Sequence, residues 1–159
     1  MRDAHGSHVL AFRRAGTSGI RAGSADRRRW AVVVKPVDQN GFGRPQGNCY
    51  AACLASILEV PLDWIPEGTR NHEHANPFLA PLGLRLVQLP KNDMRIGPRV
   101  LHILTGPSPR GNETLHATVG RGGQIIHDPH PSRAGLAGTE RQVTLLVALV
   151  PAGRLQEKR

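Results

Sequence analysis

Cysteine is scarce in this sequence: its 159 residues include only two, Cys49 and Cys53. Two cysteines cannot build a disulfide framework, and their positions one turn apart on a predicted helix are unsuited to bonding each other. The sequence therefore excludes a disulfide-stabilised secreted scaffold, and a reducing cytoplasm is the expected compartment.

Aromatic residues and long apolar runs are also rare. Phe, Trp and Tyr together make up 4% of the chain, so its core has to be built from Leu, Ile, Val and Ala. No run of about 18 apolar residues is present, which excludes a membrane-spanning helix. The N-terminal region carries arginines but no continuous apolar segment before a small-residue cleavage site, which argues against a secretory signal. We expect one folded domain with no membrane partner.

Positive charge is plentiful but unevenly distributed. Residues 1–30 contain seven arginines and two aspartates, a net charge of +5 out of the total of +9. The sequence predicts a flexible basic extension over residues 1–30, a folded domain over residues 31–153 and a charged tail over residues 154–159. Nucleic acid is an expected partner only through the arginines of the extension, which would contact phosphates without sequence preference.

Turn residues and hydrophobic periodicity divide the domain into helices followed by strands. A helix is predicted to begin at Cys49, with Asn48 as its N-cap, and to end at Glu59-Val60-Pro61. Short helical segments are predicted within 61–68, where Trp64 is expected to pack inward, and within 71–84. Strands are predicted over 84–89, 99–106, 115–120, 124–128 and 142–150. This order favours an α+β fold, with the first helix packed on a mostly antiparallel sheet.

The position of Cys49 indicates a nucleophile. The first turn of a helix carries the positive end of the helix dipole and unpaired N–H groups, and both favour a thiolate over a thiol. We therefore expect the pKa of Cys49 to lie below the ordinary value of about 8.5. Cys53, on the apolar stripe one turn later, is expected to be a core residue.

A second pair of residues supplies the partners that such a nucleophile needs. His116 and Asp128 lie on two strands joined by Arg121-Gly122-Gly123, a predicted tight hairpin. The pairing would place both residues at the same end of the hairpin. A carboxylate there can hold one imidazole nitrogen while the other faces a thiol, as in a Cys-His-Asp triad.

These motifs together resemble a known superfamily. A cysteine beginning a helix, a histidine on a strand and an Asp-Pro ending the next strand are similar to the papain-like cysteine peptidases. The block of His116, Asp128-Pro129 and Gly135 resembles that of peptidases cleaving double-glycine leader peptides. Closer still are small uncharacterised bacterial and phage proteins that share motifs of this chain over about residues 37–136. The shared motifs are DQ (38–39), GNC (47–49), ACLAS (52–56), SPRG (108–111), His116, HDPHPS (127–132) and GL (135–136).

The resemblance implies a papain-like fold and an oxyanion hole. In that superfamily a glutamine upstream of the cysteine donates to the oxyanion, which implies Gln39 or Gln46 here; we favour Gln39, because it belongs to the shared DQ motif. The backbone N–H of Cys49 would be the second donor. The implied reaction is hydrolysis of a peptide or isopeptide bond through a thioester, with no metal or organic cofactor.

Other interpretations of the same residues remain open. Arg110 could bind a substrate carboxylate or anchor its own loop to an acidic residue. His127 should point to the strand face opposite Asp128, and both it and His130 are expected to shape their loop. One rival is a metal-dependent hydrolase using His127, Asp128 and His130, with His72 or His74, although their spacing matches no recognised zinc motif. The other rival is a papain-like module that binds peptides without cleaving them.

Overall fold

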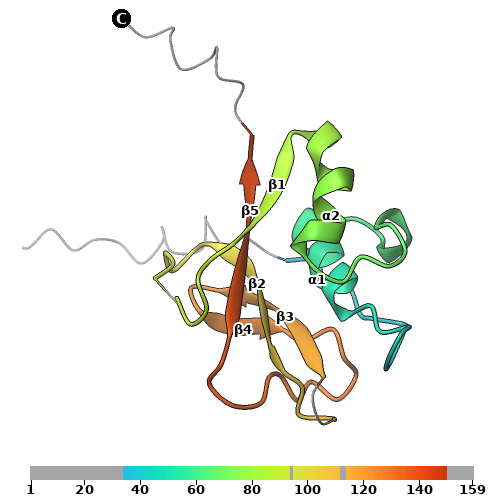
Figure 1. Ribbon diagram of the computed structural model, residues 1–159, viewed down its shortest axis with the longest axis vertical. Coiled ribbons are helices and arrows are strands. Elements are labelled where there is room, and N and C mark those ends of the chain that lie inside the picture. The colour runs from blue at the N-terminus through green and yellow to red at the C-terminus, as the bar shows by residue number, and fades with distance from the viewer. Residues whose placement is uncertain (1–33, 94, 112–113, 150–159) are drawn as a thin grey trace, which may run out of the picture. The chain divides into compact units, whose positions relative to one another are not determined.

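The structure is a computed structural model that describes residues 34–93, 95–111 and 114–149. The predicted extension over 1–30 and the predicted tail over 154–159 lie outside the described residues. Two α-helices precede a five-stranded antiparallel sheet (Figure 1), so the predicted α+β class and the order of helices before strands are confirmed. In the described part of the chain, no helix has the length and apolar character needed to cross a membrane.

The first helix, α1, spans Cys49–Leu58 and begins and ends where the sequence predicted. It ends because Glu59 adopts a left-handed conformation with φ 58°, in which its N–H bonds the carbonyl of Ala55. Asn48 occupies the N-cap position, but its side chain makes no capping hydrogen bond. Its amide oxygen instead accepts the N–H of Gly41 at 3.0 Å and so braces the loop before the helix. Asn48 is therefore the N-cap residue by position, as predicted, but its side chain does not cap the helix.

Three short helical segments follow α1 in the sequence. The 3₁₀ turn η1 spans Leu62–Trp64, α2 spans His72–Leu79, and the 3₁₀ turn η2 spans Ala80–Leu82. Both α-helices lie on one side of the strands (Figure 1), where α1 contacts the centre of the sheet and α2 contacts its first strand.

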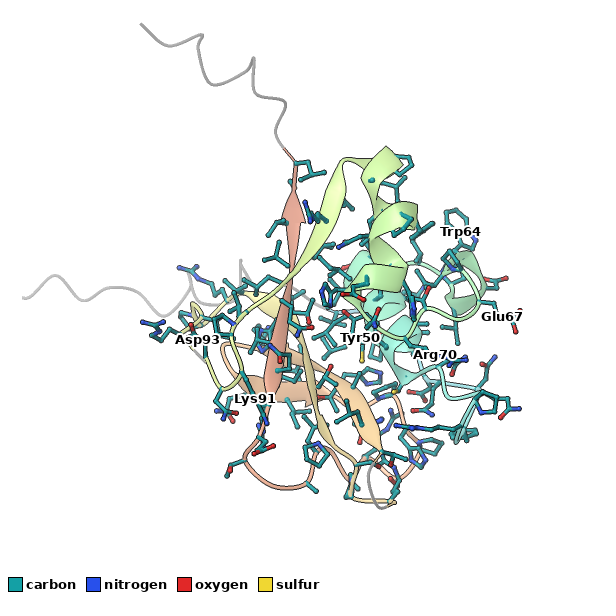
Figure 2. All side chains as sticks on the ribbon, in the orientation of Figure 1. Tyr50, Trp64, Glu67, Arg70, Lys91 and Asp93 are labelled. Atoms are coloured by element: carbon teal, nitrogen blue, oxygen red, sulfur yellow. The ribbon has the colours of Figure 1, made fainter. Side chains whose placement is uncertain are left out.

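Trp64 corrects one expectation. Figure 2 shows it at the periphery of the molecule, and it is 65% exposed. The predicted packing of Trp64 is wrong because the buried side chain of this segment is the next one, Ile65.

The sheet has the strand order β1-β5-β2-β3-β4. Each predicted strand segment contains one strand, with ends within two residues of the prediction: β1 Leu84–Gln88, β2 Leu101–Pro107, β3 Leu115–Arg121, β4 Gln124–His127 and β5 Gln142–Ala148. The last strand in the sequence, β5, is inserted between β1 and β2, which places β3 and β4 together at one edge.

The predicted hairpin joins β3 to β4, and its turn residues Gly122 and Gly123 have positive φ angles of 55° and 83°. Gly120 pairs with Ile125, but the next pair is Val119 with His127, so Ile126 is an extra residue that forms an irregularity in the ladder. Asp128 therefore follows the last paired residue of the shorter strand, where its side chain can reach back to β3.

The main apolar core lies between α1, α2 and the sheet. Leu54, Leu79, Leu86, Ile103 and Val119 are fully buried there, and aliphatic residues dominate as the composition predicted. Cys53 has no exposed surface, which confirms that it is a core residue. Tyr50 belongs to the same apolar core (Figure 2).

Candidate active site

His116 and Asp128 form a buried pair at the β3–β4 edge of the sheet. The imidazole Nε2 of His116 lies 2.7 Å from Oδ1 of Asp128, and the two residues are 4% and 5% exposed. Because the hydrogen bond uses Nε2, Nδ1 is the nitrogen left to exchange a proton with another group. The contact expected from the sequence between this histidine and this carboxylate is present.

Asp128 accepts further hydrogen bonds that hold it as a carboxylate. Its Oδ1 accepts the backbone N–H of His130 at 2.9 Å, and its Oδ2 accepts that of Gly135 at 2.7 Å. Burial by itself would raise the pKa of Asp128, but the hydrogen bonds from His116, His130 and Gly135 leave that pKa below its ordinary value. An ionised Asp128 fixes the tautomer of His116, with the proton on Nε2 and a free lone pair on Nδ1.

Cys49 is the first residue of α1 and is half-buried. Burial raises the pKa of the Cys49 thiol, although the backbone N–H groups of Ala117, Tyr50 and Cys49 itself, and the charge of Arg110, each act to lower it. The pKa of Cys49 is therefore raised, and the lowered pKa predicted from the helix N-terminus is wrong. The reason is that burial removes the sulfur from water, and the solvation free energy that a thiolate loses exceeds the stabilisation that these N–H groups provide.

The pKa of His116 is shifted as well. Burial lowers the pKa of His116, and the hydrogen bond and charge of Asp128 only partly offset this. A thiol and an imidazole are the pair that general-base catalysis uses, in which the proton leaves sulfur during attack. Among the described residues, Cys49 and His116 line the same cavity without a direct hydrogen bond between them.

That cavity measures about 600 Å³ and opens at the N-terminus of α1. Its wall includes Cys49 and His116 together with Gln39, Tyr50 and Arg110. All the residues that sequence reasoning placed in the site except Asp128 thus face one space, and Asp128 lies directly behind His116. The volume falls within the range of small-molecule and peptide-side-chain pockets.

Gln39 and Gln46, the two candidates for the oxyanion hole, have different surroundings. Gln39 is 7% exposed and lines the cavity beside Cys49, whereas Gln46 is exposed and lines a separate hollow instead. The Nε2 of Gln39 donates to the carbonyl of Gly41 at 2.7 Å, and its Oε1 is buried with no hydrogen-bond partner. This location favours Gln39 over Gln46 as the candidate donor for an oxyanion hole. One N–H of the Gln39 amide already bonds the loop before α1.

A short segment that carries Gln39 is fastened to the turn after β4. The N–H of Gln39 donates to the carbonyl of Pro129 at 3.0 Å, and Nε2 of His127 lies 3.0 Å from the carbonyl of Val37. Asp38 accepts two hydrogen bonds of 2.7 Å from Arg133, which also donates to the carbonyl of Asp128. The DQ and HDPHPS motifs are thus adjacent in space.

Arg110 lies at the junction of the cavity and this network. Its Nη1 bonds Oγ of Ser132 at 2.9 Å and lies 3.7 Å from Oδ2 of Asp128. Its Nη2 is buried and has no hydrogen-bond acceptor. The anchoring role considered for Arg110 is therefore present, and part of its guanidinium remains unused at the cavity wall.

His130 and Arg133 are site residues whose contacts the sequence did not reveal. The His130 ring stands edge-on between Phe42, with ring centres 5.3 Å apart, and His116, with ring centres 6.2 Å apart. The expected role of His130 in shaping its loop is confirmed by the bonds of its Nδ1 to Ser132. Arg133 directly follows the HDPHPS motif. We call its two hydrogen bonds to Asp38 the Arg133–Asp38 clamp. No local signal in the sequence predicts this contact.

The residues of the metal-site rival are engaged in these contacts. His127 bonds the Val37 carbonyl and His130 bonds Ser132, while Asp128 bonds His116. Within residues 34–93, 95–111 and 114–149, no three His, Cys, Asp or Glu side chains are grouped in a way that could hold a metal ion.

No protein-family model, curated protein or solved structure matches this chain.

Proposed function

We propose that this protein is a papain-like, cysteine-dependent hydrolase that cleaves an amide bond of a peptide or protein, either a peptide or an isopeptide bond. The observation that carries the proposal is the buried 2.7 Å hydrogen bond between His116 and Asp128, on the wall of the same cavity as a cysteine that begins a helix. A carboxylate that orients an imidazole beside a thiol is the arrangement that acyl transfer requires. The expected compartment is the cytoplasm.

In the first half of the proposed reaction, Nδ1 of His116 takes the thiol proton as sulfur attacks the carbonyl carbon. The Gln39 amide and the backbone N–H of Cys49 stabilise the oxyanion that forms. The C–N bond then breaks, His116 returns the proton to the leaving nitrogen, and a thioester remains on Cys49. Asp128 stabilises the imidazolium between these steps and is not itself protonated.

In the second half, water attacks the thioester and His116 accepts a proton from it. The C–S bond breaks, sulfur regains a proton from His116, and a carboxylic acid is released. The chemistry consumes one water per bond cleaved and draws only on side chains and backbone groups of this chain.

The test is labelling of the folded protein with iodoacetamide, with the adducts mapped by mass spectrometry. We expect an adduct on Cys49 and none on Cys53, which has no exposed surface and so serves as the internal control. Burial raises the pKa of Cys49. The rate of labelling should therefore keep rising with pH beyond the pKa of an ordinary thiol, about 8.5. A rate already on its plateau near pH 5 would instead reveal a thiolate–imidazolium pair in the resting site.

Turnover needs a second measurement, for which p-nitrophenyl acetate is a suitable substrate because its acyl group is small and its leaving group is activated. We expect repeated turnover by the unmodified protein and none by Cys49→Ala. The His116→Gln protein should form the acyl-enzyme slowly and fail to release it. Turnover by Cys49→Ala equal to that of the unmodified protein would overturn the proposal.

The second candidate is a papain-like module that binds peptides without cleaving them. The raised pKa of Cys49 favours it, because a neutral thiol is a weak nucleophile. This candidate predicts that folded protein binds peptides in the cavity and turns over neither esters nor amides. Ester turnover that depends on both Cys49 and His116 would rule it out.

A further inference from the structure

The cavity beside Cys49 has an uneven charge. Its described wall includes three arginines, Arg44, Arg70 and Arg110; burial lowers the pKa of the two histidines there, His116 and His130, so the arginines carry the positive charge. Among the residues described there, no Asp or Glu faces the cavity. A hollow lined by charges of one sign concentrates ligands of the opposite sign, because its low-dielectric walls focus the field.

Arg110 is the arginine best placed to contact a ligand near the reacting sulfur. Arg110 lines the cavity together with Cys49, His116 and His130, and its Nη1 lies 3.7 Å from the carboxylate of Asp128, which holds His116. Ser132 and Asp128 hold its Nη1, which fixes the direction of the group. The Arg110 side chain is 22% exposed and lines the cavity, so its guanidinium presents a fixed positive charge to a carboxylate bound there.

The two other arginines, Arg44 and Arg70, also line the cavity. Nη2 of Arg70 donates to the carbonyl of Pro45 at 2.9 Å, in the loop that precedes α1. Phe42 and Leu115 line the cavity as well and are 49% and 67% exposed. Exposed apolar side chains beside arginines suit a short aliphatic chain that ends in a carboxylate.

We propose that the substrate carries a carboxylate next to the amide that is cleaved, and that Arg110 binds it. This rests on the proposed function, because it assigns the substrate class of the same cavity. The substrate is thus a peptide with an acidic side chain, or a free carboxyl end, adjoining the scissile bond. A bidentate arginine–carboxylate contact distinguishes such a peptide from its amide analogue by about 10- to 100-fold.

The first test uses two alkylating reagents of similar size and different charge. Iodoacetate and iodoacetamide both transfer a two-carbon group to sulfur with loss of iodide, and iodoacetate alone carries a carboxylate. The ratio of their rates on Cys49, divided by the same ratio for glutathione, measures preference for an anion. We expect this normalised ratio to be about 10 in the unmodified protein and to fall toward 1 in Arg110→Gln.

Two further variants serve as controls. Arg95→Gln removes the same charge from a side chain that is 90% exposed and bonded to Asp93, outside the cavity, so the ratio should not change. Arg110→Lys keeps the charge and loses the planar fork, so it should retain part of the preference. A ratio near 1 in the unmodified protein, or one that Arg95→Gln lowers as far as Arg110→Gln does, would overturn the inference.

Binding separates this inference from the proposed chemistry. In the Cys49→Ala protein, backbone amide NMR shifts can follow titration with N-acetyl-glutamate α-amide and, separately, with N-acetyl-glutamine α-amide, in which the α-carboxyl group is capped so that only the side chain differs in charge. We expect the acid to shift amides around the cavity at about one-tenth of the concentration that the neutral analogue requires. Equal affinities would overturn the anion preference even if Cys49 proves to be a nucleophile. A preference for the acid would support the anion site even if the protein fails to hydrolyse esters.

Discussion

The two edges of the sheet are stabilised in different ways. At the β3–β4 edge the buried groups are polar: His116, Asp128 and the backbone groups that they bond. At the β1 edge they are apolar, with Leu79 and Leu86 fully buried between α2 and the sheet. There a single polar side chain, Asn76, closes the outer side of β1 by bonding both the N–H and the carbonyl of Leu86, at 2.7 and 3.1 Å.

If the proposed function holds, this difference separates function from stability. Buried polar groups contribute little net free energy of folding but hold each other in one geometry, whereas buried aliphatic groups contribute most of the stability and little chemistry. Changes at the β3–β4 edge should therefore alter turnover more than unfolding. Changes at the β1 edge should do the reverse, and each prediction below tests this contrast.

The largest effect is expected from Asp128→Asn. The substitution removes the charge that stabilises the imidazolium and favours the wrong tautomer of His116, so ester turnover should fall by about 10³- to 10⁴-fold. Urea unfolding of the same protein checks that it remains folded. Turnover within tenfold of the unmodified protein would mean that Asp128 only supports its loop.

The next largest effect is expected at the opposite edge, from Leu86→Ala. Removal of this fully buried side chain leaves a cavity between α2 and the sheet, which should lower the free energy of unfolding by about 2–5 kcal/mol. Turnover per folded molecule should stay within about twofold of the original. A large loss of turnover in the folded protein would show that the two edges are not independent.

A smaller effect is expected from Arg133→Gln, which releases Asp38 and loosens the segment that carries Gln39. We expect ester turnover to fall by about tenfold, because losing one oxyanion donor outright costs about 10²- to 10³-fold and here it is only displaced. The free energy of unfolding should change by less than about 1 kcal/mol, since the ion pair is half-exposed. Asp38→Asn provides the matched partner for a double-mutant cycle, and independent effects of the two substitutions would contradict the clamp.

The smallest effect is expected on the pH dependence of the free energy of unfolding. His102, on β2, is fully buried, with its Nδ1 at 3.0 Å from the Val100 carbonyl and its Nε2 without a partner. Burial lowers the pKa of His102 and of His116, so each stays neutral in the folded protein at a pH where the unfolded chain takes up a proton. Their contribution is complete above about pH 6.5 and is lost as the pH falls below that value.

Urea unfolding between about pH 5 and 7.5 measures this loss. His102→Leu should flatten the pH dependence without altering the pH profile of Cys49 labelling, because His102 lies outside the cavity. An unchanged slope would show that other groups carry the pH dependence of stability.

Local patterns were enough to predict the elements and one contact of the site. The helix that begins at Cys49 and the hairpin turn at Gly122-Gly123 follow from the pattern of proline, glycine and apolar residues, which acts over a few residues. The contact of His116 with Asp128 followed because twelve residues folded as a hairpin leave few registers. The extra residue Ile126 in the ladder was not predicted, since irregularities of this kind depend on what packs against the strand.

Contacts between distant segments could not be predicted in this way. Asp38 and Arg133 are 95 positions apart in the sequence, and only the folded chain brings the ion pair together. The insertion of β5 between β1 and β2 is likewise a choice among strand orders that the strand sequences do not distinguish.

The sequence by itself determined which residues begin and end the helices and strands, and which residue types carry chemistry, because backbone preferences and side-chain groups are local properties. The tertiary structure alone decided in which direction the pKa of Cys49 shifts. Helix position suggested a lowered pKa, but burial raises it. The cost of removing a charge from water depends on everything that surrounds the sulfur, and segments from the whole length of the domain supply those surroundings.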